Sequence, residues 1–178
     1  MKGDVDTSSE EGGAGGFQGE SRATANEPAR GRGQDALSLL EKDHRNVEKL
    51  FKRAQKDPAV FDQIREELDL HTRVEEEIFY PAVEEALGDE GEGIVEEARR
   101  EHQEVKDLLV ELSAMDRQGE EFEDRLQKLQ DNVEHHVQEE EGEMFKKTRR
   151  AMTKETLTQL GAQMESQKEE MRTVLAQS

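Results

Sequence analysis

The chain has 178 residues, with 44 acidic against 25 basic residues and a formal net charge of −19. This length suits a single domain, and the charge disfavours nucleic acid as a partner because a phosphate backbone would be repelled. The absence of cysteine excludes disulfides, thiolate zinc sites and iron–sulfur clusters, so any metal must be held by histidine and carboxylate side chains.

The balance of apolar and charged residues favours an all-α fold. Apolar residues make up 31% of the chain and charged residues 39%, which is typical of long helices with solvated outer faces. No stretch approaches the roughly 20 apolar residues that a membrane span needs, and the N-terminus has no apolar run. We therefore predict no membrane partner and a cytoplasmic location.

A glycine-rich polar segment begins the chain. Residues 1–34 hold eight of the fourteen glycines and have almost nothing to bury beyond Phe17. Such a composition cannot bury enough apolar surface to offset the entropy lost on ordering. We predict a disordered tail over residues 1–34 that aids solubility, with a partner-binding arm as the alternative.

The first predicted helix begins at Asp35, a suitable N-cap residue. Apolar residues then recur in steps of three and four, which is the spacing of one helix face. The steps close only if His44 takes the place between Leu40 and Val47. His44 is therefore predicted to point inward.

The second helix is predicted to begin with Pro58 in its first turn. Its inward positions, again in steps of three and four, include the pair His71 and Glu75. Pro81 has no N–H to bond the preceding turn, which predicts a kink or a weakened turn just beyond the pair.

Two more helices with inward histidines are predicted after a glycine-rich turn over residues 88–93. The third helix carries His102 on its apolar face. The fourth follows Gly119 and carries His136 and Glu140 at inward positions, which repeats the pair of the second helix.

Residues 154–175 form a fifth amphipathic stretch with leucines and methionines on one side. A methionine-rich stripe is more often packing than a cofactor site, so we expect this helix to cover the bundle or a dimer interface. The chain is thus divided into a tail at 1–34, a four-helix bundle at 35–150 and a C-terminal helix at 151–178, and it is predicted to be a monomer or a homodimer.

An internal repeat supports this division. Residues 43–51, DHRNVEKLF, match residues 101–109, EHQEVKDLL, and residues 71–80 resemble residues 136–145. The bundle is therefore predicted to be two similar hairpins, each with one inward histidine on its first helix and a His-x-x-x-Glu pair on its second.

The inward polar residues together indicate a metal site. One histidine on an apolar face is usually structural, but four of five on such faces would arise by chance in about 2–3 cases in 100. Buried carboxylates cost several kcal/mol unless a positive charge compensates them. We predict a pair of metal ions held by six side chains: His44, His71, Glu75, His102, His136 and Glu140.

This pattern resembles the hemerythrin-like (HHE cation-binding) family, whose four helices carry a His, a His-x-x-x-Glu, a His and a His-x-x-x-Glu in that order. The resemblance covers about residues 35–150 and includes the EEEIFYP motif at residues 75–81. It implies an antiparallel up-and-down bundle with a di-iron centre bridged by carboxylate and by oxo or hydroxo groups. Manganese and zinc are alternatives, because imidazole–carboxylate sites accept several metals.

The chain departs from the oxygen-carrying hemerythrins, which it also resembles, at two points. Those proteins have a second histidine four residues after the third-helix histidine, where Lys106 stands here, and an Asp in the last motif. One ligand fewer leaves open or water-filled positions on both irons. This difference favours peroxide or nitric oxide chemistry, or iron sensing, over reversible oxygen carriage.

We therefore predict a non-haem di-iron protein that binds dioxygen, nitric oxide or peroxide in a response to oxidative or nitrosative stress, or in iron sensing. The first alternative is a catalase-like enzyme that disproportionates hydrogen peroxide, for which no catalytic residue is assigned. The second is a metal-free interaction bundle with structural histidines. A ferritin-like oxidase is disfavoured because those bundles use Glu-x-x-His.

Three further residues adjoin the predicted ligands. His135 precedes His136, and successive helical residues point about 100° apart, so only one of the two faces inward; the register with the second helix selects His136. His135 is predicted to lie at the surface or just outside the ligands. Glu143 is expected on a solvated turn or as a further oxygen donor, and Tyr80 as a packed phenol or as a neighbour of the metals.

Overall fold

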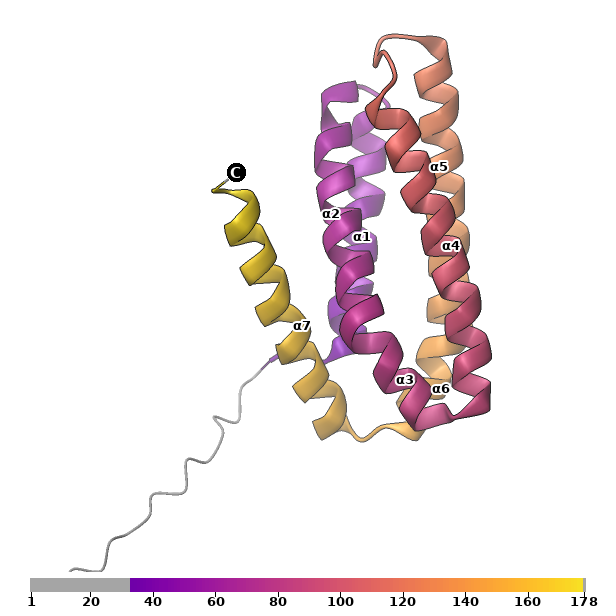
Figure 1. The fold of residues 1–178 in the computed structure, drawn as a ribbon, viewed down its shortest axis with the longest axis vertical. Coiled ribbons are helices and arrows are strands. Elements are labelled where there is room, and N and C mark those ends of the chain that lie inside the picture. Colours follow the sequence, from indigo (N-terminus) through magenta and orange to yellow (C-terminus); the bar gives the residue numbers. More distant parts are fainter. Residues whose placement is uncertain (1–32, 178) are drawn as a thin grey trace, which may run out of the picture. The chain divides into compact units, whose positions relative to one another are not determined.

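The computed structural model of the chain describes residues 33–177, and every regular element in that range is helical (Figure 1). The predicted all-α class is confirmed. The tail predicted over residues 1–34 lies outside the described residues, apart from Gly33 and Gln34. None of the described helices is long and apolar enough to cross a membrane.

The first hairpin consists of α1 (Ala36–Ala54) and α2 (Phe61–Val74), joined through the short 3₁₀ turn η1 (Pro58–Val60). Asp35 and Asp57 cap α1 and η1, because each carboxylate accepts a hydrogen bond from a backbone N–H two or three residues later. Both predicted helix starts are present in the structure.

A π-helical turn, η2 (Glu75–Phe79), links α2 to α3 (Tyr80–Leu87). The N–H of Tyr80 donates to the carbonyl of Glu75, five residues earlier. Pro81 follows directly and has no N–H of its own to donate. The irregularity expected from Pro81 is therefore a π turn, and it begins at the inward glutamate itself.

The next helix, α4 (Asp89–Ser113), starts earlier than expected, so the turn predicted over residues 88–93 is wrong in extent. The turn is confined to Gly88, whose φ of 60° is a conformation that glycine adopts without strain. Acidic residues in the first turn of α4 favour a helix N-terminus there. Gly91 serves packing instead, since a Cβ on it would lie 2.8 Å from the carbonyl oxygen of Val83 in α3.

The second hairpin pairs α4 with α5 (Glu120–Glu139), which continues through a second π turn, η3 (Glu140–Met144), into α6 (Phe145–Ala151). This π turn also begins at an inward glutamate, with the N–H of Phe145 donating to the carbonyl of Glu140. The two hairpins stand side by side as an up-and-down four-helix bundle (Figure 1).

Two apolar cores fill the bundle. One core joins the C-terminal half of α1 to α2 and to the facing parts of α4 and α5. The other joins the start of α1 to α3, the start of α4, the η3–α6 segment and α7. The predicted inward histidines and glutamates lie where the two cores meet along the four helices of the bundle, so they form a polar layer across its middle.

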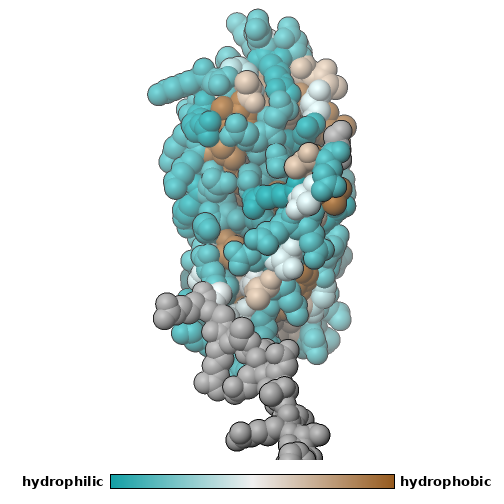
Figure 2. All heavy atoms as spheres, turned by 90° about the vertical axis from the view of Figure 1, so that its left-hand side faces the viewer, coloured by the Kyte–Doolittle hydropathy of each residue, from teal (hydrophilic) through white to brown (hydrophobic). Residues whose placement is uncertain are grey.

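The last helix, α7 (Lys154–Leu175), packs against α1 and α2 on the outside of the bundle (Figure 1). Leu157 and Met164 enter the second core, which confirms that this helix covers the bundle. Lys168 is also buried, at 4% exposure. The face that carries α7 is mostly hydrophilic, with hydrophobic residues scattered over it (Figure 2).

Candidate metal centre

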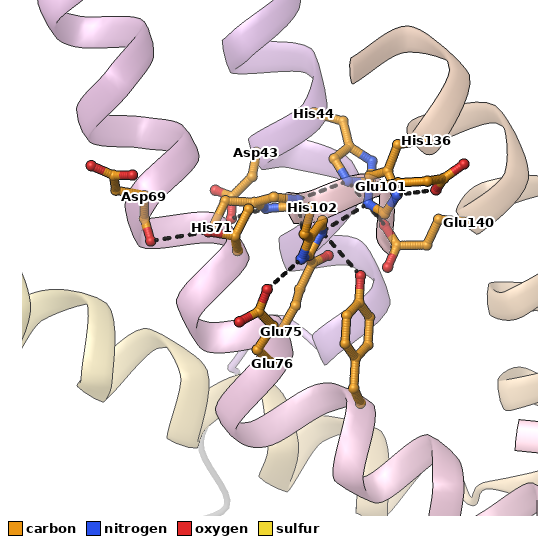
Figure 3. Close-up of polar contacts among 12 residues, drawn as sticks. Asp43, His44, Asp69, His71, Glu75, Glu76, Glu101, His102, His136 and Glu140 are labelled. Atoms are coloured by element: carbon orange, nitrogen blue, oxygen red, sulfur yellow. Dashed lines mark hydrogen bonds and ion pairs between the residues drawn. The ribbon is translucent and has the colours of Figure 1, made fainter. Parts of the chain in front are cut away.

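The six predicted ligand residues converge in the polar layer of the bundle (Figure 3). They come from both hairpins, and each is at most 5% exposed: His44, His71, Glu75, His102, His136 and Glu140. Their role as ligands stays a prediction, but the structure brings all six together.

The four histidines direct their Nε2 atoms toward one another in two pairs. The Nε2 atoms of His44 and His71 are 3.2 Å apart, and those of His102 and His136 are also 3.2 Å apart. One nitrogen of each ring is therefore available to the interior of the site.

Each inward glutamate reaches a histidine from both hairpins. Glu75 Oε2 lies 3.2 Å from the Nε2 atoms of His71 and of His102. Glu140 Oε2 lies 3.2 Å from Nε2 of His44 and 3.7 Å from Nε2 of His136. Both carboxylates therefore span the two hairpins.

Two groups of donor atoms in this layer could each hold a metal ion. The first contains His44, His71, Glu75 and Glu140, and the second contains Glu75, His102 and His136. In each group the donor atoms lie within 4.8 Å of one another. The groups share Glu75, which is the arrangement expected of a carboxylate that bridges two ions.

The other nitrogen of each histidine bonds a carboxylate outside the centre. The Nδ1 atoms of His44, His71, His102 and His136 lie 2.9, 3.5, 3.0 and 2.8 Å from Glu141, Asp43, Glu76 and Glu101, respectively. Such partners fix the ring orientation and the tautomer of a metal-binding histidine. Sequence reasoning missed all four, although each directly precedes or follows an inward residue in the sequence.

Three of these outer carboxylates are neutralised by cationic side chains. Lys168 Nζ lies 2.5 Å from Asp43, Lys106 Nζ lies 2.7 Å from Glu76, and an Arg45 nitrogen lies 2.7 Å from Glu141. Lys106, which replaces a histidine of the oxygen-carrying hemerythrins, therefore supports His102 through Glu76. Lys168 ties α7 to the centre in the same way.

The inward carboxylates face imidazole nitrogens but have no hydrogen-bond donor among the described residues. Within the described residues, no oxygen of Glu75 or Glu140 receives a hydrogen bond. Buried polar atoms are normally satisfied, so these four oxygens need an explanation. A pair of divalent cations supplies one, since carboxylate oxygens and imidazole nitrogens suit iron, manganese and zinc. The donor set fits such metals.

The pKa values of the inward residues are shifted because their charges are buried without full compensation. Burial and the charge of Glu140 raise the pKa of Glu75 well above its usual value. Burial opposes the charge on His44, but the neighbouring carboxylate of Glu140 outweighs burial and raises the pKa of His44 to about 9. Burial lowers the pKa of His71 to about 4. The site thus keeps protons at positions that a cation would take.

The three adjoining residues lie at different depths. Tyr80 is fully buried, and its hydroxyl lies 3.1 Å from Nε2 of His102. The side chain of His135 is 64% exposed and adjoins Glu101 and Glu139. The side chain of Glu143 is 61% exposed and pairs with Lys147, so it points away from the central layer.

The chain matches the family model of the hemerythrin HHE cation binding domain over residues 35–148. It therefore belongs to this family. The crystal structure of a hemerythrin HHE cation binding domain-containing protein from Mycobacterium kansasii is similar, with a TM-score of 0.69 and 26% identity over 79% of this chain and 89% of that one.

Two longer proteins are also similar to the chain. A DNA nickase of Nostoc sp. is 33% identical over 141 residues, which is 76% of this chain and 38% of the nickase. An uncharacterized hemerythrin-like protein of Schizosaccharomyces pombe is 37% identical over 75 residues, which is 42% of this chain and 37% of that protein. The chain thus spans well under half the length of either relative.

Proposed function

We propose that the chain is a non-haem di-iron protein that binds dioxygen, nitric oxide or hydrogen peroxide at its buried centre. The observation that supports this most is the pair of donor groups that share Glu75. The proposed role is in a response to oxidative or nitrosative stress, or in iron sensing.

The residues divide between two ions in this proposal. His44 and His71 would hold one iron together with Glu140, His102 and His136 would hold the other, and Glu75 would bridge them. When bound, the irons supply open coordination positions and a change of redox state to small molecules. The outer carboxylates keep the imidazoles oriented while a ligand comes and goes.

The space beside the histidines suits a very small ligand. A cavity of about 20 Å³ is lined by all four inward histidines and otherwise mostly by valine and leucine side chains. Room for a water molecule begins at roughly 10–15 Å³, so this cavity has space for one diatomic molecule or peroxide. Its apolar wall favours an uncharged ligand.

Tyr80 supports a second candidate, a catalase-like disproportionation of two hydrogen peroxide molecules to dioxygen and two waters. Burial raises the pKa of Tyr80 well above its usual value, so the phenol keeps its proton beside His102. It can therefore donate a hydrogen bond to a ligand. Oxygen evolution from peroxide by the iron-loaded protein, diminished in Tyr80→Phe, would favour the enzyme, and its absence would favour binding or sensing.

The metal content of the protein tests the main proposal. We expect about two irons per chain after purification from iron-supplied cells, and we expect His71→Ala and Glu75→Gln to lower the iron content and the iron-dependent thermal stability together. Glu66→Gln, at an exposed position of α2, is the matched control and should change neither. Full iron retention in both variants would contradict the ligand assignment, and a protein that carries no metal after purification from iron-supplied cells would favour the interaction bundle.

The name of the nickase relative raises the question of nucleic acid. We propose that this chain does not bind it, because a net charge of −19 repels a phosphate backbone.

A further inference from the structure

The sequence HHVQEE at residues 135–140 contains two overlapping His-x-x-x-Glu pairs. His136 and Glu140 point into the centre, whereas His135 and Glu139 lie one position earlier, about 100° around α5. The side chains of His135 and Glu139 are 64% and 51% exposed, and His135 Nε2 lies 3.4 Å from Glu139 Oε1. The proposed function leaves this outer pair without a role.

Glu101 on α4 connects the outer pair to the centre. Its Oε2 accepts a hydrogen bond from Nδ1 of His136 at 2.8 Å, while its Oε1 lies 3.4 Å from Nε2 of His135. Glu101 is 9% exposed, and Oε1 is buried without a hydrogen-bond partner among the described residues. An unpartnered buried carboxylate oxygen is costly, so a cation at this position would stabilise it.

Glu101 also differs from the other outer carboxylates. Asp43, Glu76 and Glu141 each pair with a lysine or an arginine. Within the described part of the chain, Glu101 has only the imidazoles of His135 and His136 as ion-pair partners. Three of the four outer carboxylates therefore have a partner with a fixed positive charge, and Glu101 does not.

A pocket of about 200 Å³ leads from this side to the centre. Its lining includes Glu101 and Glu139, which lie outside the centre, and His136 and Glu140, which point into it. Both oxygens of Glu140 are buried and receive no hydrogen bond from the described residues, so the inner end of the pocket also presents carboxylate oxygens that could bind a cation.

We propose that Glu101, His135 and Glu139 form an auxiliary site that receives a divalent cation at the surface and passes it through this pocket to the central layer. The three donor atoms lie within 4.8 Å of one another, and one imidazole with two carboxylates suits the same metals as the centre. The exposure of two of the three ligands suits brief binding. This inference rests on the proposed function, because it supplies that centre with its metal.

The rate of iron uptake tests the auxiliary site. The full-length chain, stripped of metal, is mixed anaerobically with Fe²⁺, and protein-bound iron is measured at timed intervals. The double variant His135→Gln/Glu139→Gln should load about tenfold more slowly, a change typical of lost electrostatic steering, and should reach the same final iron content. Glu123→Gln, exposed on the same helix about 24 Å away, is the charge-matched control for Glu139→Gln and should load at the wild-type rate.

A binding measurement with Mn²⁺ alone complements the rates. Wild-type protein should bind one Mn²⁺ ion per chain more than the double variant does, and this additional ion should be weakly held. Electron paramagnetic resonance of the free ion gives the count.

Equal loading rates or equal Mn²⁺ counts would overturn the auxiliary site and leave the centre intact. A lower final iron content in the double variant would also overturn it, because His135 and Glu139 would then belong to the permanent centre. Failure of the wild-type chain to take up iron would overturn the proposed function itself.

Discussion

Each inward histidine is oriented by a carboxylate that lies next to a different inward residue in the sequence. Asp43 precedes His44, and Glu76 follows Glu75. Because neighbours on a helix point about 100° apart, one residue of each pair enters the centre and the other reaches the flank of a histidine on another helix. The orientation of every imidazole thus depends on a second helix being in place.

Proton release on metal binding is predicted from the protonation of His44. Its pKa is raised from 6.5 to about 9, so the metal-free folded chain holds a proton at pH 7 that the unfolded chain has largely lost. This proton stabilises the metal-free fold below pH 6.5, and the contribution is lost as the pH rises through 9. Since a metal needs the neutral imidazole, binding at pH 7 should release about one proton per chain or more, and apparent affinity should rise with pH.

Calorimetric titration with Fe²⁺ in two buffers of different ionisation enthalpy measures this release. Identical binding heats in both buffers, with an affinity that does not change with pH, would contradict the prediction.

At the level of elements, the two π turns place the inward glutamates. Pro81 gives a reason for the first, but η3 contains no proline, and only the internal repeat between residues 71–80 and 136–145 points to it. π turns inside α-helices are frequent at functional sites. Both π turns begin at a predicted ligand. The π turn therefore occurs with the candidate site and does not require a proline.

The packing of α7 against the start of α1 depends on Gly161, and we predict the effect of adding a single methyl group at this position. A Cβ on Gly161 would lie 2.8 Å from the backbone nitrogen of Ala36, and backbone at a helix start cannot move aside cheaply. Gly161→Ala should therefore lower the free energy of unfolding by about 2 kcal/mol, although alanine favours helix by about 1 kcal/mol. Urea unfolding measures the change.

Gly93→Ala is the control for this substitution, because a Cβ there would meet nothing within 4 Å. It should leave stability unchanged or raise it by up to about 1 kcal/mol. Similar losses in both variants would show that the contact between α7 and the start of α1 does not matter.

The whole described unit consists of two apolar cores separated by the polar layer of the candidate centre. The apolar cores stabilise each end of the bundle mainly by burial of apolar surface. The middle layer brings together buried carboxylates and histidines whose charges are compensated only in part. Metal binding would therefore stabilise the middle of the bundle more than its ends.

Hydrogen exchange should reveal this difference between the layers. Removal of metal by a chelator is expected to lower the melting temperature and to speed amide exchange most around His44, His102 and His136, with smaller changes in the apolar ends of α1 and α5. Mass spectrometry of exchanged peptides from the loaded and stripped protein measures both. A uniform change along the helices would contradict a stabilising role for the middle layer.

The helices, their inward faces and the six inward polar residues were predictable from the sequence, because helical periodicity is a local property that one chain segment reveals. The caps at Asp35 and Asp57 were predictable for the same reason. The turn over residues 88–93 was misjudged, since glycines that serve close packing look the same in a sequence as glycines that make a turn.

The contacts between groups on different helices became known only from the folded structure. It paired the outer carboxylates with their histidines and brought Lys168 of α7 to Asp43. It also placed a pocket beside Glu101, the one outer carboxylate of the four without a lysine or arginine partner. These partners are separated by up to 125 residues in the chain. Their contacts follow from how whole helices pack, and no local spacing of residues specifies that packing.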